Sequence, residues 1–310
     1  LLNPSLVKFA FKVSNAKWIS SFKINKVSIK NSYPNFMFSI LPESEGFDIQ
    51  NAFACALASK AAYQSPELIG HQIGEEWKVP NVLPFNFSNV RGFIAASEDY
   101  TLISFLGSER DYEIWQENID ASFIEGPFNQ GDRVHRGFNK GIEQEIINIE
   151  SKMINVGSKN APIFLTGHSL GGAIANLAAA YLYKTNHPIH SVYTFGAPRV
   201  GCKNFKDIYN RFDNGRSFRV VNRHDIVCRI PPRVLRYKHV GELYYLNSEG
   251  TIHKGVNSWK RLLLYLDPSG KEPKAYIKEL AKRFPNALED HSMDKYLKKI
   301  RLLKHSADLF

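Results

Sequence analysis

The chain has 310 residues, a formal net charge of +10 and 44% hydrophobic residues, enough to bury the core of one large or two small domains. Its three cysteines, Cys55, Cys202 and Cys228, form no Cys-x-x-Cys or His/Cys cluster, which argues against a disulfide scaffold and a zinc site. We expect three buried thiols rather than a Cys202–Cys228 bridge. Because no run of about 18 apolar residues occurs, the sequence predicts no transmembrane helix.

The positive charge lies at the two ends of the chain. Residues 1–40 hold six lysines and no acid, and residues 251–310 hold thirteen Lys and Arg against seven Asp and Glu. Basic ends favour contact with an anionic surface, either phospholipid or nucleic acid, but no nucleic-acid motif is present. We therefore expect no nucleic-acid partner, and we weigh peripheral membrane contact against ordinary solvated lysines. We expect a soluble or peripheral protein, secreted if a signal peptide has been removed before Leu1.

Strands alternate with helices along the chain, which predicts an α/β sheet protein. The predicted strands cover 27–30, 90–96, 100–105, 163–165, 191–195 and 217–221, with a late hairpin at 237–246 and 251–252. The predicted helices cover 48–63, 139–154, 173–182, 259–266, 274–284 and 293–304. Residues 67–89 are predicted to be a loop because they contain Pro80 and Pro84.

The pattern Gly-x-Ser-x-Gly occurs at Gly167–Gly171, with an apolar strand before it and an Ala- and Leu-rich helix after it. This strand–serine–helix order is typical of a nucleophile elbow, in which a tight turn pushes the hydroxyl of Ser169 out over the sheet edge. Glycines on either side let the strand and the helix pass closely. The start of the helix directs amide donors and its positive dipole end at an anion that forms there. Ser169 is therefore the predicted nucleophile.

A serine hydroxyl needs a base to remove its proton, and this base is normally a histidine oriented by a carboxylate. In elbow proteins the order along the chain is serine, then acid, then histidine. Asp225 directly follows the predicted strand at 217–221, whereas Asp207 and Asp213 precede that strand. Asp225 is therefore the predicted acid.

The predicted base is one of four later histidines. His291 lies on a loop before the final helix, the position that the elbow order requires, and His253 is the alternative. His239 lies inside a predicted strand and His305 lies in the tail.

The oxyanion of an acyl-transfer intermediate needs hydrogen-bond donors. One predicted donor is the backbone N–H of Leu170, the residue after the nucleophile. The other is Ser108, which follows the strand at 100–105 and offers both its N–H and its hydroxyl.

These residues together resemble the class 3 lipase family, the fungal-type triacylglycerol lipases whose relatives include diacylglycerol lipases and plant phospholipases A1. The matching pieces are Phe105–Ser108, Val134–Phe138, Gly167–Ala173, Thr194–Gly201, Val221–Asp225, His239–Gly241 and Asp290–Met293. The resemblance implies an α/β-hydrolase fold over 41–310, with a mostly parallel central sheet and helices on both faces. It also implies a short lid at 109–118 that carries Ile114 and Trp115. The implied site needs no metal or cofactor and consists of the triad Ser169, Asp225 and His291 with an oxyanion hole of Ser108 and Leu170.

The chain departs from the family pattern at several positions. Leu106 stands where the family usually has Arg, and Asn118 stands where it usually has an Asp that braces the oxyanion hydroxyl. Asp-Ile-Val replaces the usual Asp-Pro-Val at the triad acid. We interpret residues 254–288 as an insertion before the histidine and residues 1–40 as a basic segment outside the resemblance.

The sequence predicts a serine carboxylester hydrolase, a lipase that cleaves acyl esters of glycerolipids at a lipid–water interface through an acyl-enzyme. One alternative is a phospholipase A1 that prefers anionic lipids, which the basic ends favour. The other is a non-catalytic lipase-like binding module, which the departures at Leu106 and Asn118 favour.

Overall fold

A mixed eight-stranded sheet forms the centre of the computed structural model, which describes residues 38–87, 89–108, 121–157, 160–255, 279–280 and 282–307. The strands follow the spatial order β1-β2-β3-β6-β7-β8-β9-β10. Their bounds are β1 Asn81–Asn86, β2 Arg91–Ala96, β3 Thr101–Phe105, β6 Ile163–His168, β7 Ile189–Phe195, β8 Ser217–Asn222, β9 Glu242–Leu246 and β10 Ile252–Lys254. A separate pair consists of β4 Phe123–Glu125 and β5 Arg133–His135.

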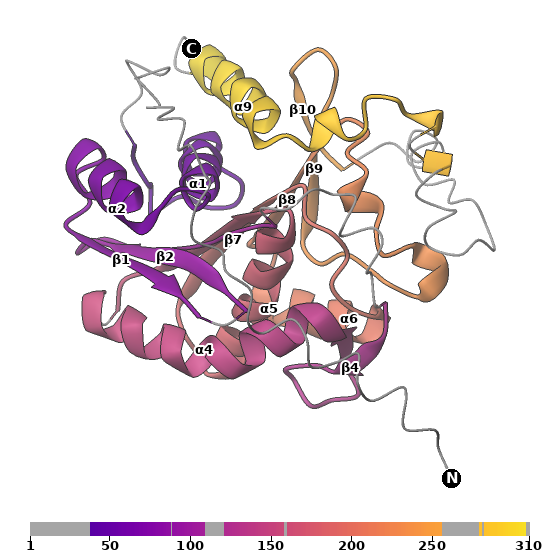
Figure 1. The fold of residues 1–310 in the computed structure, drawn as a ribbon, viewed down its shortest axis with the longest axis horizontal. Helices are drawn as coiled ribbons and strands as arrows, with labels where there is room; N and C mark the ends of the chain where they lie inside the picture. Colours follow the sequence, from indigo (N-terminus) through magenta and orange to yellow (C-terminus); the bar gives the residue numbers. More distant parts are fainter. Residues whose placement is uncertain are drawn as a thin grey trace, which may run out of the picture. The chain divides into compact units, whose positions relative to one another are not determined.

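The strands from β3 to β9 in this order are parallel, and antiparallel strands complete both edges of the sheet. Helices cover both faces (Figure 1). On one face lie α1 Ile49–Ala61 and α9 Met293–Ala307, and on the other lie α4 Arg136–Val156, α5 Leu170–Lys184 and α6 Lys203–Asp213. The predicted mostly parallel sheet with helices on both faces is confirmed. In such a sheet the carboxyl ends of parallel strands meet at one edge, where loops carry function.

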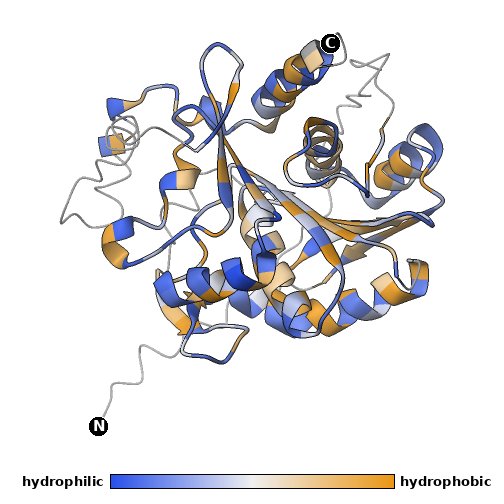
Figure 2. Cartoon of the chain, turned by 180° about the vertical axis from the view of Figure 1, so that it is seen from behind, coloured by the Kyte–Doolittle hydropathy of each residue, from blue (hydrophilic) through white to orange (hydrophobic). Residues whose placement is uncertain are grey.

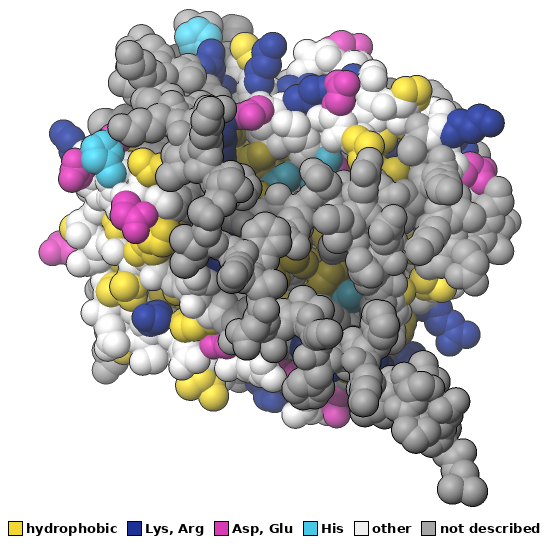
Figure 3. All heavy atoms as spheres, viewed as in Figure 1, with side chains coloured by type: hydrophobic (Ala, Val, Ile, Leu, Met, Phe, Trp, Pro, Cys, Tyr) yellow, Lys and Arg dark blue, Asp and Glu magenta, His cyan; other side chains and the backbone are white. Residues whose placement is uncertain are grey.

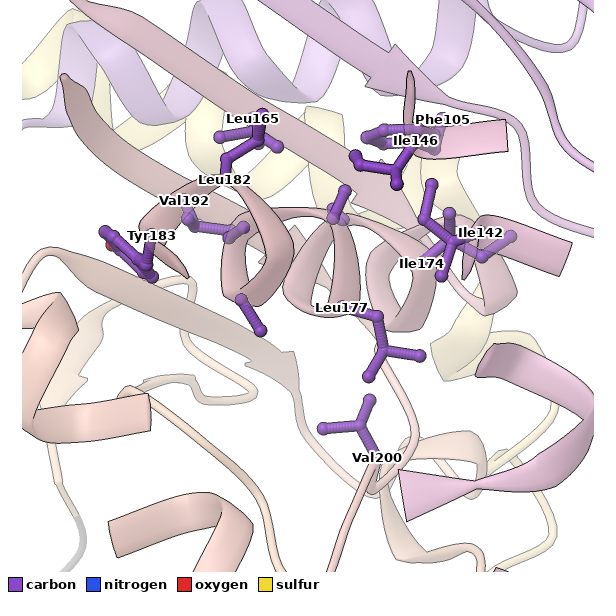
Figure 4. Close-up of a cluster of buried hydrophobic side chains, with 14 of the residues drawn as sticks. Phe105, Ile142, Ile146, Leu165, Ile174, Leu177, Leu182, Tyr183, Val192 and Val200 are labelled. Atoms are coloured by element: carbon purple, nitrogen blue, oxygen red, sulfur yellow. The ribbon is translucent and has the colours of Figure 1, made fainter. Parts of the chain in front are cut away.

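Helix α5 is buried on nearly all sides, which its five alanines and two glycines allow because they let neighbouring backbones approach. Its larger side chains, such as Leu177, pack into the main hydrophobic cluster between the sheet and α4 (Figure 4). Helix α4 is amphipathic: Ile142 and Ile146 are buried, whereas Ile147 and Ile154 are exposed, and Figure 2 shows the resulting bands of colour. Each fully buried side chain of this size contributes about 1.5–3 kcal/mol.

Helix α1 is fixed to the opposite face of the sheet by buried hydroxyl groups. Its N-terminus is capped by the carboxylate of Asp48. Further along, Ser59 Oγ lies 2.9 Å from Thr166 Oγ1 of β6, and Ser104 Oγ of β3 donates to the carbonyl oxygen of Ala58 at 3.0 Å. These bonds fix where the helix ends and therefore where Tyr63, two residues past its last turn, is held.

The prediction of a loop at 67–89 is wrong. Ser65 caps a short helix, α2 Pro66–Ile69, which continues as a π-helical segment, Gly70–Glu76, before strand β1. Strand β1 accommodates Pro84 because, among the described strands, it lies at the edge and pairs only with β2, so one N–H can be missing without breaking the ladder. Pro66 starts a helix here because the first helical position needs no N–H donor.

Two further expectations can be compared with the structure. The late hairpin is present, but β9 begins at Glu242 rather than at residue 237, because Gly241 turns the chain with a φ of +70° immediately before it. His239 therefore lies outside a strand. All three cysteines are buried free thiols, as predicted.

The predicted strand at 27–30, the lid with Ile114 and Trp115, the helix at 259–266 and most of the helix at 274–284 lie outside the described residues. The domain boundary near residue 40 and the insertion at 254–288 stay predictions. None of the helices in the described ranges combines the length and hydropathy of a membrane span.

A buried carboxylate, Asp213, joins the end of α6 to β8. It accepts hydrogen bonds from Tyr183 Oη at 2.8 Å and from both the hydroxyl and the backbone N–H of Ser217, the latter at 3.0 Å. Removing this carboxylate therefore takes the acceptor away from the buried hydroxyl of Tyr183 and from the buried N–H of Ser217.

We predict that Asp213→Ala lowers the free energy of unfolding by about 3 kcal/mol, because each unsatisfied buried donor costs about 1–3 kcal/mol. The control is Asp207→Ala on the same helix, whose exposed pair with Lys203 is worth less than about 1 kcal/mol. Urea unfolding of both variants measures the difference, and equal stabilities would contradict this account of the α6–β8 junction.

Candidate active site

Ser169 lies on the turn between β6 and α5 with backbone angles of φ 57° and ψ −128°. This conformation is strained for a residue with a side chain. The turn is held by the backbone N–H of Ser169, which donates to the carbonyl oxygen of Phe195 at 2.9 Å. A Cβ atom at Gly167 would fall on the backbone of Gly171, and one at Gly171 would fall on the backbone of Phe105. The elbow geometry predicted from the motif is therefore present.

His291 lies in a short 3₁₀ turn, Glu289–His291, directly before α9. Its Nδ1 atom lies 3.0 Å from Oδ1 and 2.9 Å from Oδ2 of Asp225. A carboxylate only accepts, so Nδ1 carries the proton in the neutral ring and Nε2 is left as the basic nitrogen. The structure thus joins two residues that are 66 positions apart in the sequence.

The carboxylate of Asp225 is completely buried and fully surrounded by donors. Tyr296 of α9 donates to Oδ2 at 2.7 Å, and the backbone N–H of Val227 donates to Oδ1 at 2.9 Å. Burial by itself raises the pKa of Asp225, but the adjacent His291 and the hydrogen bonds from His291 and Tyr296 outweigh it, so the pKa lies below its ordinary value. Asp225 is therefore an anion that orients the imidazole.

Gly196, directly after β7, makes room for this pair. Its φ is +63°, and a Cβ atom there would lie 2.7 Å from Oδ2 of Asp225 and 2.9 Å from Nδ1 of His291. A side chain at this position would push the histidine and the carboxylate away from the elbow. Gly196 and Tyr296 belong to the site, although the motif-based prediction assigned neither a role.

The loop that carries Asp225 is tied to the segment that carries His291. The side-chain amide of Asn222 donates to the carbonyl oxygen of Asp290 at 2.8 Å, and the backbone N–H of His224 donates to the buried carboxylate of Asp290 at 3.2 Å. Both catalytic candidates are therefore held by short polar contacts rather than by loop packing alone.

The alternative histidines and acids lie elsewhere. His253 is on the edge strand β10, where its ring lies 2.9 Å from the hydroxyl of Thr251. His239 has its Nε2 atom 2.8 Å from the carbonyl oxygen of Cys228. Asp207 pairs with Lys203 on the surface of α6, and Asp213 serves the α6–β8 junction. His305 lies in the last turn of α9.

The two predicted oxyanion donors lie at neighbouring strand ends. Leu170 is the first residue of α5, and the first N–H groups of a helix have no partner within it. Ser108 is half-buried and follows β3, whose last residue pairs with Gly167 of β6. Leu106, which departs from the family pattern, is buried, with its backbone N–H bonded to the carbonyl oxygen of Arg91 at 2.9 Å. Asn118 and the lid lie outside the described residues.

Known proteins share this sequence pattern. The family model described as Lipase (class 3) matches residues 102–235. A secreted mono- and diacylglycerol lipase of Fusarium solani is 40% identical over 121 residues, which are 38% of this chain and 35% of that protein. Phospholipase A(1) DAD1 of Arabidopsis thaliana is 31% identical over 175 residues, or 46% of this chain and 38% of that protein. The chain therefore spans well under two thirds of the length of either relative.

Solved structures share the fold. The mono- and diacylglycerol lipase of Aspergillus oryzae superposes with a TM-score of 0.60 at 20% identity, covering 80% of this chain and 96% of that one. At this identity the likeness shows the fold, which is the α/β-hydrolase fold. The family match covers the elbow and the strand ends on either side of it, so over residues 102–235 the chain is similar to the class 3 lipase family.

Proposed function

We propose that the chain is a serine carboxylester hydrolase, a lipase that cleaves acyl esters of glycerolipids through an acyl-enzyme. The observation that carries this proposal is the strained Ser169 at the start of α5, on the same sheet edge as the hydrogen-bonded pair His291–Asp225. The match to the class 3 lipase model supports the same reaction class, and the relatives are named as lipases and a phospholipase.

In the proposed reaction the hydroxyl of Ser169 attacks the ester carbonyl while Nε2 of His291 takes its proton. His291 then gives this proton to the leaving alcohol, and the acyl group remains on Ser169. Water attacks the acyl-enzyme in the second half of the cycle, with His291 again as the base. Asp225 remains ionised throughout and stabilises the imidazolium that forms at each step.

The N–H of Leu170 and Ser108 are the proposed hydrogen-bond donors to the oxyanion of each tetrahedral intermediate. The strained turn places the hydroxyl of Ser169 beside the first amides of α5. The positive end of this helix dipole therefore faces the charge that develops on the oxyanion. The site requires no metal for this chemistry. The lid at 109–118, with Ile114 and Trp115, stays a prediction and would control which lipid reaches Ser169.

We predict that Ser169→Ala lowers turnover of p-nitrophenyl butyrate by about 10⁶-fold, because the nucleophile is lost. The same change abolishes labelling by a fluorophosphonate probe, which reports an activated serine directly. Ser248→Ala, at an exposed turn, is the matched control and keeps full activity. Equal rates for wild type and Ser169→Ala would exclude the mechanism, and a wild type that the probe leaves unlabelled would favour a non-catalytic binding module.

Asp225→Asn is expected to reduce kcat by about 10⁴-fold, because an amide favours the wrong tautomer of the histidine. The protein should still fold, since the amide has almost the same size and can accept the bond from Tyr296. Asp207→Asn, on the surface of α6, is the control. A loss of less than tenfold in Asp225→Asn would assign the role of the acid to another residue.

The substrate class is the part of the proposal that an activity panel decides. Triacyl-, diacyl- and monoacylglycerols and a phospholipid are compared at equal interfacial area, each with wild type and Ser169→Ala. For each lipid, the hydrolysis rate of wild type minus that of Ser169→Ala is the rate of hydrolysis at this site.

A second candidate, a phospholipase A1 that prefers anionic lipids, is favoured by the charge of α9. This helix carries five Lys and Arg and one acid, and it begins two residues after His291. Figure 3 shows Lys and Arg side chains along the upper margin of the face, where Figure 1 places α9. Cations at this position would bring an anionic surface close to the site entrance.

We predict that anionic phosphatidylglycerol in phosphatidylcholine vesicles raises binding and hydrolysis at low salt and that high salt removes the effect. Lys298→Ala, an exposed residue of α9, should weaken vesicle binding about fivefold, because one lysine near such a surface is worth about 1 kcal/mol. The control is Lys140→Ala on α4 at the opposite face. Rates that depend on neither lipid charge nor salt would rule out this candidate.

A further inference from the structure

His168, the residue before the nucleophile, has no part in the proton transfer described above, yet it touches the catalytic histidine in two ways. Its side chain is 6% exposed. Its Nε2 atom lies 2.7 Å from the backbone carbonyl oxygen of His291, and its Nδ1 atom lies 2.9 Å from the hydroxyl of Tyr63. The two rings also stack, with centroids 4.5 Å apart and planes inclined by 29°.

The partners determine which way these hydrogen bonds run. A backbone carbonyl only accepts, so Nε2 of His168 carries the proton. A neutral imidazole has one N–H, so Nδ1 accepts from the hydroxyl of Tyr63. Burial and the neighbouring His291 lower the pKa of His168 to about 3, so the ring is neutral at any higher pH. The result is a hydrogen-bond network in which the hydroxyl of Tyr63 donates to His168 and His168 donates to the backbone carbonyl of His291.

This hydrogen-bond network holds His291 at a second point. Asp225 fixes Nδ1 of the ring, and His168 fixes the backbone from which the ring extends. A ring held at Nδ1 alone can still tilt when the short turn at 289–291 shifts. With both ends held, the direction of Nε2 is determined.

The neutral ring of His168 also favours the positive charge that His291 gains during the reaction. His291 becomes a cation when it takes the proton of Ser169. A second cation stacked on it would oppose that step, whereas a neutral aromatic ring 4.5 Å away offers an electron-rich face.

Tyr63 connects the same hydrogen-bond network to the oxyanion side of the site. Its hydroxyl lies directly against Gly107, where an added Cβ would collide with it and would lie 2.7 Å from the carbonyl oxygen of His168. Tyr63 comes from the end of α1, which the hydroxyl contacts to β3 and β6 hold in place. One rigid helix end therefore supports the loop of Ser108, the elbow and the histidine.

We propose that His168 and Tyr63 are positioning residues that hold His291 through its backbone carbonyl in the orientation for proton exchange with Ser169. The inference rests on the proposed esterase function. It assigns both residues to the rate of the chemical step and not to substrate binding.

The experiment measures kcat and KM for p-nitrophenyl butyrate in four variants beside wild type and records a melting curve for each. His168→Phe keeps a ring but loses the N–H, and we expect kcat to fall about 100-fold with KM unchanged, the scale of a misplaced catalytic group. His168→Gln places an amide N–H near the same carbonyl and should recover about tenfold of that loss. Tyr63→Phe should lower kcat about fivefold to tenfold, as expected for an orienting contact one step further away.

Tyr181→Phe is the matched control, because it also removes one tyrosine hydroxyl bond, to Asn139, at a site remote from His291. Its kcat should equal that of wild type. The inference is overturned if Tyr63→Phe matches Tyr181→Phe, if His168→Gln is no faster than His168→Phe, or if the losses appear in KM. Should His168→Phe fail to fold, Tyr63→Phe against Tyr181→Phe decides the question alone. Ser169→Ala, run in parallel, separates the two proposals: activity that survives in it refutes the esterase mechanism itself.

Discussion

The buried carboxylate of Asp225 is the constraint on which the geometry of the site depends. An ionised carboxylate removed from water costs several kcal/mol unless its oxygens are hydrogen-bonded. Here the donors are His291, Tyr296 and the backbone N–H of Val227, which come from three separate segments. Satisfying one charge therefore requires the start of α9, the turn before it and the loop after β8 to meet at one point.

The elbow carries a second cost, the strained backbone of Ser169, which is worth about 1–3 kcal/mol. The surrounding structure makes this conformation the only one that fits, because β6 is buried along its whole length and α5 on nearly all sides. Close backbone contacts at Gly167 and Gly171 leave no room for relaxation. Rigid packing behind Ser169 and hydrogen-bonded loops in front of it are thus two parts of the same arrangement.

The sequence predicted helices and strands correctly where a single pattern, such as an apolar run, dominated the segment. The face rich in Ala, Leu and Phe in α1, the Ala- and Leu-rich run of α5 and the apolar runs of the central strands predicted those elements. Chain order proposed Asp225 and His291, and the structure brings these two side chains into hydrogen-bond contact. The segment 67–89 was missed because its prolines suit a helix start and an edge strand as well as a loop. Tyr63 and Tyr296 could not be found from the sequence, because their roles exist only after α1 and α9 have packed on the same face of the sheet.

The proline at the outer edge of the sheet has a further consequence. An open edge strand presents free N–H and C=O groups on which another chain can add a strand, and such pairing leads to aggregation. Pro84 removes one donor from β1, and at the other end β10 is only three residues long and carries Lys254. Among the described strands, edges of this kind leave few positions at which a second copy of the chain could extend the sheet.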